Sequence, residues 1–549
     1  MASNRIRKII YIPDREIVGD NFFLLGNNKR KKSTRMKKDY QENLSKRVKK
    51  VPVRLVIAGA ITFLEAFLYL SLIIFAHINV KYFSIAVFLV KALCLLSVLS
   101  SDDNPDYKVP WLVFIMFFPL IAVLFYQLFY SKKLSKKYLS RIKKIKNITY
   151  EKDDTDILES LKSQNEKAYL HAKTLLSLAK THAFNNCECK YFQTGEESLT
   201  KLYSDLENAK KFIYLEYYII SGGKFLSDLF SVIKKKAHEG VEVKILFDDF
   251  GSLFTLPKKF IKTLKRCNIQ AIPFSRIKYG LNRTINNRNH RKICIIDGII
   301  CYTGGINIAD EYIGEVKRFG EWKDSAIRLK GECVYEYTKL FLVDFGVSNP
   351  KFIPNRNDYF PKLKTNRKGF YVPFGDAPYP ICKRRVAKTL IENLISNAKK
   401  SIIITTPYLV LDNGLLCVIE NAAIKGVDVK IILPGIPDKK WIKQVGKSFY
   451  FRLINAGVKI YEYKKGFVHA KTFLIDDEFA LLGSINFDYR SLVHHFENGV
   501  FMYNTQTIKD VRRDMEKLLL DCERILKEEH IGISKKFVRA IIRVFSPLL

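Results

Sequence analysis

The chain has 549 residues, and its 92 Lys and Arg against 55 Asp and Glu give a formal net charge of +37. This length is too great for one ordinary domain, and a hydrophobic fraction of 48% excludes a disordered protein. The basic surplus indicates a polyanionic partner, either nucleic acid or an anionic lipid surface. The ten cysteines form neither a dense disulfide framework nor a repeated CxxC metal clip, which favours a reduced, cytosol-facing main domain.

Residues 1–54 form a basic arm, with 16 basic and five acidic residues in a polar tract of little periodicity. We expect a mostly solvated segment, whose purpose stays open between binding to a lipid surface and a disordered tail. No short apolar run followed by small residues stands near the N-terminus, so a cleaved signal peptide does not fit.

The next region, residues 55–130, contains three apolar runs. These occupy residues 55–76, 82–100 and 111–130. Each run is about long enough to cross ~30 Å of hydrocarbon as a helix, so the sequence predicts a transmembrane region of two to three helices. Glu65 and Lys91 lie near the middle of the first two runs. They either form an intramembrane ion pair or show that one run does not span the membrane.

The charges that flank this region leave its topology ambiguous. Eight basic residues and no acid lie between residues 132 and 146, so the positive-inside rule assigns both flanks to the cytoplasm. Three full spans cannot place both flanks on one side, so either one run fails to cross or one basic flank lies outside. We expect a multi-pass protein of the cell membrane with its catalytic domain on the cytoplasmic side.

Residues 131–190 predict a basic helical linker, after which strand-like and helix-like patterns alternate as in an α/β protein. The pattern repeats, because the strand segment at residues 240–246 returns nearly unchanged at residues 426–432. This repetition predicts two similar lobes, residues 191–375 and 376–549, related by a pseudo-twofold axis with a candidate site at the seam.

One motif occurs in both lobes: a His-x-Lys pair, an apolar strand that ends in Asp, and a Gly-(Gly/Ser)-Ile-Asn segment. Its members are His290, Lys292, Asp297 and Asn307 in the first lobe and His469, Lys471, Asp476, Ser484 and Asn486 in the second. The chain has only nine histidines, so about 0.15 chance matches to the His-x-Lys-x4-Asp spacing are expected. Two matches, in register with an independent repeat, therefore indicate a function.

The duplicated motif suits chemistry at a phosphodiester. Residues two apart in a strand share a face, so two copies gather two imidazoles and two ammoniums around one centre. One neutral imidazole can attack phosphorus, while the other, as an imidazolium, protonates the leaving oxygen. The lysines and asparagine amides hold the non-bridging oxygens, and Ser484 can donate to phosphate, although the first lobe has Gly305 at that position. No metal or other cofactor is required.

Asp297 and Asp476 are the ambiguous members of the motif. Each ends an apolar strand at a place where Asp also favours a turn, so structural support is at least as good an interpretation as direct chemistry. We group them with the catalytic residues on the motif alone and expect neither to be a general base.

These residues resemble the phospholipase D superfamily, whose signature is a duplicated His-x-Lys-x4-Asp, and within it the bacterial cardiolipin synthases. The likeness covers roughly residues 55–549 and rests on segments around both motifs and on one ahead of the third apolar run. They are residues 287–292, 304–307, 311–312, 322–324, 466–469, 487–491, 496–497 and 104–108. The resemblance implies an α/β fold with two similar phospholipase D-like lobes, each a mixed sheet flanked by helices, after an N-terminal helical membrane region.

The resemblance also implies a reaction. In the family one histidine is the nucleophile, which by position is His290, and the other, His469, is the general acid and then the general base. A phosphatidyl group would pass from one phosphatidylglycerol to another through a phosphohistidine, giving cardiolipin and glycerol without ATP. Asp324 and Glu497 stand where the family places a carboxylate that orients each histidine, unless they are ordinary surface acids.

Other functions stay open from the sequence. A phospholipase D or a phosphatidylserine-type synthase would differ only in the nucleophile that enters. A membrane-tethered nuclease suits the net charge, but three apolar runs argue against it, so we expect phosphatidylglycerol and anionic membrane lipids as partners and no nucleic acid. The intact His and Lys pairs disfavour a catalytically inactive lipid-binding scaffold. The sequence does not indicate an oligomeric state.

The C-terminal segment, residues 535–549, has the pattern of a basic amphipathic helix. Its apolar face carries Phe537, Ile541, Val544, Phe545 and Leu548, and four Lys and Arg lie elsewhere. Such a helix either lies in an anionic membrane interface or packs against the catalytic body.

Overall fold

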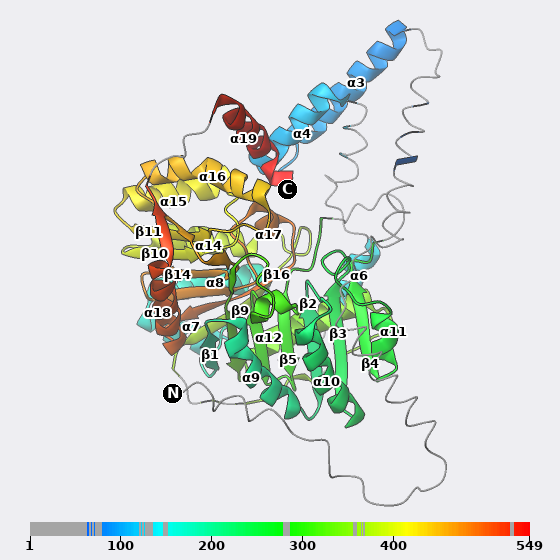
Figure 1. Cartoon of the computed structure of the whole chain (residues 1–549), viewed down its shortest axis with the longest axis vertical. Coiled ribbons are helices and arrows are strands. Elements are labelled where there is room, and N and C mark those ends of the chain that lie inside the picture. Colours follow the sequence, from blue (N-terminus) through cyan, green and yellow to red (C-terminus); the bar gives the residue numbers. More distant parts are fainter. Residues whose placement is uncertain are drawn as a thin grey trace, which may run out of the picture. The chain divides into compact units, whose positions relative to one another are not determined.

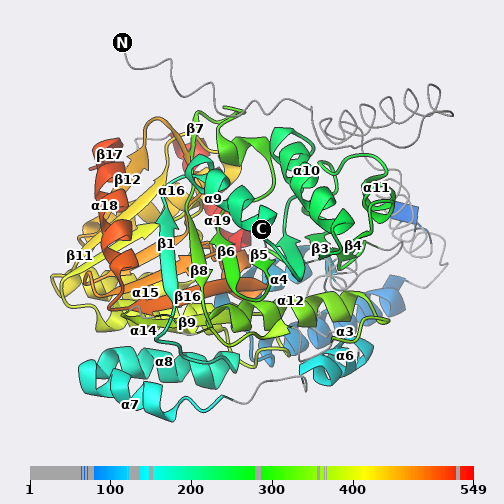
Figure 2. The same ribbon diagram turned by 90° about the horizontal axis from the view of Figure 1, so that it is seen from below.

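The computed structural model describes residues 80–119, 136–146, 152–277, 286–354, 359–363, 368–526 and 532–548, together with a few single positions. Residues Leu44–Leu549 belong to one compact unit, which contains both lobes. Figures 1 and 2 show this unit from two sides, with the first lobe mainly in green and the second in yellow to red. The basic arm of residues 1–54 lies outside the described residues.

The first lobe is built on a seven-stranded mixed sheet. Its strands are β1 (Glu188–Phe192), β2 (Phe212–Tyr217), β3 (Glu242–Asp248), β4 (Ile269–Phe274), β5 (Lys292–Ile296), β6 (Ile300–Gly304) and β8 (Ala326–Lys330). Their order is β1-β8-β6-β5-β2-β3-β4. Strands β2, β3 and β4 run parallel, linked by α10 (Lys224–His238) and α11 (Phe260–Lys265), whereas the other neighbours are antiparallel.

The second lobe repeats this architecture in an eight-stranded sheet. Its strands are β9 (Phe370–Asp376), β10 (Ser401–Thr405), β11 (Asp428–Pro434), β12 (Lys459–Tyr463), β14 (Thr472–Ile475), β15 (Phe479–Gly483), β16 (Glu497–Tyr503) and β17 (Cys522–Ile525). The order β17-β12-β11-β10-β14-β15-β16-β9 matches the first sheet strand for strand once the extra β17 is set aside. The parallel strands are linked here by α15 (Asn413–Ile424) and α16 (Lys440–Asn455). The predicted duplication of an α/β lobe is thus confirmed.

A helix of each lobe also packs on an edge strand of the other lobe. Helix α12 (Val334–Ser348) packs on its own sheet and on β9, and α18 (Gln506–Leu520) packs on its own sheet and on β1 (Figure 2). A two-stranded parallel sheet of β7 (Glu321–Lys323) and β13 (Gly466–Val468) joins the lobes directly. The exchanged contacts fix the two sheets relative to each other.

A common hydrophobic core lies between the two sheets. Ile293 and Leu329 from the first sheet and Leu482 and Val500 from the second belong to one cluster, and all four are fully buried. Apolar side chains that interdigitate at crystal-like density resist displacement. The core therefore holds the two motifs at a constant separation.

The boundary between the sheets differs from the predicted one. β9 pairs with β16 along its whole length, from Phe370 opposite Tyr503 to Asp376 opposite Glu497, so the second sheet begins at Phe370 and not at residue 376. Pro373 and Gly375 interrupt the apolar pattern of this edge strand. Both residue types weaken the sequence signal of a strand, so the start of β9 could not be recognised from the sequence.

Among the described residues, five helices precede the first sheet. They are α3 (Val80–Leu99), α4 (Pro105–Phe117), α6 (Lys136–Lys146), α7 (Thr155–Gln164) and α8 (Glu166–Ala179). In the part of the chain that the structure describes, no helix combines the length and the apolar character that a membrane span requires. Glu65 falls outside the described residues, so its predicted ion pair with Lys91 stays a prediction.

Candidate active site

The two motifs meet because each one bonds to a segment of the opposite lobe. β13 leads into His469, whose amide donates to the carbonyl of Lys323 at the end of β7 over 2.7 Å. In the same way the amide of His290 donates to the carbonyl of Phe496 over 2.9 Å. Both histidines are therefore fixed at the seam between the lobes.

Glu497, the first residue of β16, orients His290. Its two carboxylate oxygens lie 3.0 and 3.1 Å from Nδ1 of the imidazole. This carboxylate is fully buried and also accepts hydrogen bonds from the hydroxyls of Ser484 and Ser491. Because a proton on Nδ1 faces the carboxylate, the neutral ring keeps a lone pair on Nε2 for attack.

Asp324 does the same for His469. Its Oδ2 lies 2.7 Å from Nδ1 of His469, and its Oδ1 accepts the amide of Ser325 over 2.8 Å. Asp324 belongs to the first lobe and His469 to the second, so the carboxylates are exchanged between the lobes. The two acids singled out from the sequence thus lie on the far nitrogens of the two histidines, each paired with the opposite motif.

Lys292 and Lys471 are almost completely buried beside these imidazoles. Nζ of Lys292 donates to the carbonyl of His290 over 2.5 Å, and Nζ of Lys471 donates to the carbonyl of His469. Burial lowers the pKa of Lys471 to about 8 and the pKa of Lys292 well below its ordinary value. Burial thus disfavours the charged form of both lysines, and a bound anion would stabilise that form.

Burial and the neighbouring lysines favour the neutral form of both imidazoles. Burial, followed by the charges of Lys292 and Lys471, lowers the pKa of His290 well below its ordinary value, and the same causes act on His469. An anionic phosphodiester between the two histidines offsets the lysine charges and raises the pKa of both imidazoles. Once a phosphodiester has bound, an imidazole can therefore carry the proton that the leaving oxygen needs.

Asp297 and Asp476 do not reach this centre, which corrects their grouping with the catalytic residues. They lie at the far ends of β5 and β14, and the five residues of β5 alone extend about 16 Å. Asp297 accepts the amides that precede β2, and Asp476 accepts those that precede β10. The donors are Lys210, Lys211 and Phe212 in the first lobe and Lys399, Lys400 and Ser401 in the second. Both aspartates therefore bind the main-chain amides at the start of a neighbouring strand.

The predicted phosphate-binding residues separate into two groups. Asn307 and Asn486 line the cavity that contains both histidines, and Oδ1 of Asn486 has no hydrogen-bond partner among the described residues. The hydroxyl of Ser484 instead donates to Glu497, so its role as a phosphate donor stays a prediction. At the equivalent position a Cβ on Gly305 would lie 2.0 Å from Oδ1 of Asp324, so only glycine fits there.

One cavity of about 700 Å³ contains both histidines. This volume lies within the usual range of small-molecule sites, about 300–1,000 Å³. Its wall includes three half-exposed aromatic side chains and three cationic ones. These are Phe250, Phe254 and Trp441, and Arg318, Lys439 and Arg490. Three acidic residues, Glu311, Asp438 and Asp488, line the same cavity, so its wall combines apolar, cationic and acidic groups and fits an amphiphile with a polar head.

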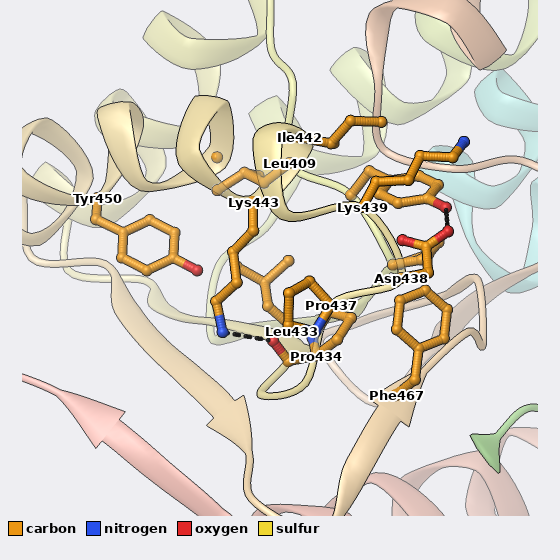
Figure 3. Close-up of a pocket in the computed structure, with 13 residues that line it drawn as sticks. Leu409, Leu433, Pro434, Pro437, Asp438, Lys439, Ile442, Lys443, Tyr450 and Phe467 are labelled. Atoms are coloured by element: carbon orange, nitrogen blue, oxygen red, sulfur yellow. Dashed lines mark hydrogen bonds between the residues drawn. The ribbon is translucent and has the colours of Figure 1, made fainter. Parts of the chain in front are cut away.

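A smaller cleft lies beside this cavity, under the start of α16 (Figure 3). Tyr408 and Asp438, joined by a hydrogen bond of 2.6 Å, belong to the walls of both spaces. The cleft has a volume of about 20 Å³, enough for one water molecule. Phe467 is one of its lining residues, and the centre of its ring lies 5.9 Å from that of His469. The cleft is therefore part of the packing behind this histidine.

The surroundings of the two histidines are chemically different. Around His469 lie the rings of Trp322 and Tyr312, with ring centres at 5.3 and 5.2 Å. Around His290 the nearest rings are Tyr218 at 5.0 Å and His495 at 5.3 Å. One half-site is therefore aromatic and the other is mainly polar.

His495 is a cavity residue that the sequence analysis missed. It lies two positions before Glu497, as Trp322 lies two positions before Asp324. Its Nε2 accepts a hydrogen bond from Nε of Arg490 over 3.2 Å, and burial lowers its pKa to about 3. The position two residues before each orienting carboxylate is the sequence signal that would have identified His495.

The described residues include one group of metal-ligating type at this site. Ligand atoms of His290, His495 and Glu497 lie within 4.8 Å of one another. Glu497 is already bonded to His290 and to two serine hydroxyls, and Lys292 and Lys471 repel a cation at His290. The group is therefore explained as an oriented imidazole and its carboxylate.

The segment ahead of the third apolar run docks on α17, the short helix that carries Arg490. Tyr107 in α4 stacks on Tyr489 with ring centres 5.9 Å apart, and it lies 5.4 Å from the ring of His494. Tyr489 is the first residue of α17 (Tyr489–Val493). The helix that follows α3 is thus tied directly to one wall of the site.

Comparison with known proteins places these features in a family. A family model described as "Cardiolipin synthase, PLD-like domain" matches residues 202–318 and 391–519, one copy in each lobe, and a second, "Phospholipase_D-nuclease N-terminal", matches residues 90–129. An uncharacterized protein of Streptococcus mutans serotype c is 37% identical over 80% of this chain and 96% of its own length. A cardiolipin synthase of Geobacillus sp. (strain WCH70) is 34% identical over 82% of this chain and 90% of its own length.

A solved structure gives independent support for the fold. The crystal structure of phosphatidylserine synthase from Haemophilus influenzae Rd KW20 matches 69% of this chain and 100% of that chain, with a TM-score of 0.55 and 15% sequence identity. At this identity the likeness concerns the fold alone. Taken with the relatives and the two matched domains, the chain belongs to the cardiolipin synthase family of the phospholipase D superfamily.

Proposed function

We propose that this protein is a cardiolipin synthase, which transfers a phosphatidyl group from one phosphatidylglycerol to another and releases glycerol. The observation that carries the proposal is a single cavity with two carboxylate-oriented imidazoles, His290 and His469. Lys292 and Lys471 supply the positive charge that a phosphodiester needs.

In the first step, Nε2 of His290 attacks the phosphorus of the donor lipid. The bond between phosphorus and the headgroup glycerol oxygen breaks, and His469 gives its Nε2 proton to that oxygen. Glycerol leaves, and the phosphatidyl group stays on His290 as a phosphoramidate. Glu497 stabilises the positive charge that develops on the His290 ring during attack.

In the second step, a headgroup hydroxyl of another phosphatidylglycerol enters the place that glycerol left. His469, now neutral, takes the proton of this hydroxyl as its oxygen attacks phosphorus. The nitrogen–phosphorus bond breaks and cardiolipin is released with both histidines restored. One phosphodiester replaces another, so no ATP is consumed.

We also propose that residues 55–130 hold the protein in the membrane, with the catalytic domain on the cytoplasmic side. The apolar runs support this, as do the exposed side chains of Phe88, Leu93 and Leu96 on α3, each more than 60% exposed. Protease digestion of intact cells that carry a C-terminal tag tests the orientation. We expect a protected tag, and cleavage from outside would contradict the proposal.

The activity is tested with purified protein and phosphatidylglycerol that is labelled separately in its acyl chains and its headgroup glycerol. We expect cardiolipin and glycerol in equal amounts, and neither product from a His290→Ala, His469→Ala double variant. Phosphatidic acid without cardiolipin would instead identify a phospholipase D. A serine-dependent product would identify a phosphatidylserine-type synthase, and cleavage of DNA would identify a nuclease.

A further inference from the structure

The C-terminal helix α19 (Ile533–Phe545) presents its apolar side chains outward. Phe537, Val538 and Ile541 are 66%, 53% and 43% exposed, and Val544 is 37% exposed. Helices on a globular body normally bury this face. The outward face of α19 is therefore unpartnered in the described chain.

The basic side of α19 contacts the catalytic body instead. Arg539 is 9% exposed, and its Nη2 donates to Oε1 of Gln444 in α16 over 2.8 Å. One turn further, Arg543 lies over the ring of Phe449, 4.7 Å from the ring centre, and donates to the carbonyl of Ser448. The orientation of α19 is thus set by specific polar contacts, and packing against the catalytic body, one of the two alternatives left open by the sequence, is confirmed.

A neighbouring helix also exposes apolar side chains. α19 contacts α4, beside which it lies in Figure 1. Met116 and Phe117 near the end of α4 are 61% and 71% exposed. Exposed apolar side chains on two helices that contact each other mark an interaction site.

This surface lies next to the active site. Ser546, directly after α19, is one of the residues that line the catalytic cavity. The short segment Ser546–Leu548 also contacts both α4 and α17, which carries Arg490. Whatever covers α19 therefore lies close to the cavity that the two histidines line.

We infer that α19 lies in an anionic lipid bilayer, with its apolar face among the acyl chains and its basic side on the catalytic body. Besides Arg539 and Arg543, which contact the body, the helix has two lysines and no acid, and Lys536 is exposed beside the apolar face. A basic amphipathic helix with a large outward apolar face has the character of an interfacial helix. The inference requires a membrane surface at the cavity but does not depend on cardiolipin as the product.

Insertion is tested by fluorescence with the full chain, reconstituted into bilayers of phosphatidylcholine mixed with phosphatidylglycerol. Phe537→Trp adds an indole on the exposed face, and part of the phosphatidylcholine carries bromine on its acyl chains as a quencher. We expect a blue shift and the loss of most of the added fluorescence. Leu520→Trp is the matched control, because Leu520 at the end of α18 is 83% exposed but lies outside α19, and its added fluorescence should persist.

Three outcomes would overturn the inference. One is unquenched emission from Phe537→Trp in these bilayers, and another is equal quenching of both indoles. The third is a blue shift in detergent that grows with protein concentration, since it would show that a second copy of the chain covers the face. Equal quenching of Phe537→Trp in bilayers of phosphatidylcholine alone would overturn the preference for anionic lipid.

A functional arm separates this inference from the proposed reaction. Phe537→Glu with Ile541→Glu should lower turnover of phosphatidylglycerol in bilayers by about tenfold or more, because two apolar contacts with lipid are lost. Turnover of short-chain phosphatidylglycerol in detergent should stay unchanged, and equal loss in both media would contradict the inference. Ile424→Glu with Leu520→Glu, at exposed apolar positions on other helices, should lower neither. Absence of cardiolipin from all variants and the parent would refute the proposed function and leave the quenching result intact.

Discussion

The carboxylate of Glu497, which belongs to the second lobe, lies 3.0 Å from Nδ1 of His290, which belongs to the first. Asp324 completes the exchange, since it belongs to the first lobe and lies 2.7 Å from Nδ1 of His469 in the second. Each lobe therefore supplies a histidine to one half-site and a carboxylate to the other.

Replacing the first of these carboxylates tests its role. We expect Glu497→Gln to lower kcat by about a hundredfold or more with little change in KM, because the amide neither fixes the ring nor stabilises its positive charge. Steady-state kinetics in mixed micelles measure the effect, and circular dichroism verifies the fold. Glu420→Gln, the same change on α15, should be neutral. Full activity of Glu497→Gln would remove Glu497 from the mechanism.

The roles of the two histidines can be separated with an activated donor, a phosphatidyl ester of 4-nitrophenol. This leaving group needs no acid, so we expect His469→Ala to release one equivalent of nitrophenolate and to keep the phosphatidyl group. His290→Ala should release none. Mass spectrometry of the intact protein detects the adduct, and an adduct in His290→Ala would reverse the assignment.

The aspartates of the motif should behave as structural residues. Asp297→Asn removes the charged acceptor of three main-chain amides, so we expect the free energy of unfolding to fall by about 1–3 kcal/mol. The kcat of the folded fraction should stay within about twofold of the parent value. Denaturant titration and kinetics on the same sample measure both quantities. A large loss of kcat without loss of stability would return Asp297 to the chemistry.

Activity should have a maximum between about pH 6 and about pH 8. Burial raises the pKa of Asp324 to about 6, so protonation below that pH releases His469 from its orienting acceptor. Burial lowers the pKa of Lys471 to about 8, so deprotonation above that pH removes a cation from the phosphate site. The pH profile of kcat/KM measures both limbs. Lys471→Arg should move only the basic limb upward, and an unchanged basic limb would exclude Lys471 as its source.

Binding of an anion to the empty site should take up protons. Burial and the neighbouring lysines lower the pKa of both catalytic imidazoles, and a bound phosphate raises it again. Calorimetric titration with inorganic phosphate near neutral pH, in two buffers of different ionisation enthalpy, gives the number of protons exchanged. We expect net uptake that the His290→Ala, His469→Ala double variant loses. Proton release on binding would contradict the expectation that both imidazoles are neutral before the anion binds.

The sequence predicted the duplicated α/β lobes and the paired His-x-Lys motifs because both are local patterns. A spacing of two residues keeps His290 close to Lys292, the first residue of β5, whatever the rest of the chain does. The exchange of carboxylates could not be predicted in the same way, since His290 and Glu497 are 207 positions apart and their pairing depends on how two sheets share a core.

Side-chain roles were the least predictable part of the site. Ser484 stands where a phosphate donor is expected, but the buried carboxylate of Glu497 needs hydrogen bonds, and the serine hydroxyl supplies one. Asp297 satisfies the main-chain amides of a loop that is remote in sequence. Both outcomes follow from buried polar groups that require partners, which a short motif does not reveal.

The exchange of orienting carboxylates also constrains how the two repeats can evolve. A substitution that tilts β16 changes the aim of the imidazole in the other repeat, so neither copy of the ancestral unit can drift independently at these strands. Mutations accepted in one repeat restrict those accepted in the other repeat. This dependence does not extend to helices on the outside of each lobe. A duplicated gene built in this way is bound to remain a single inherited unit.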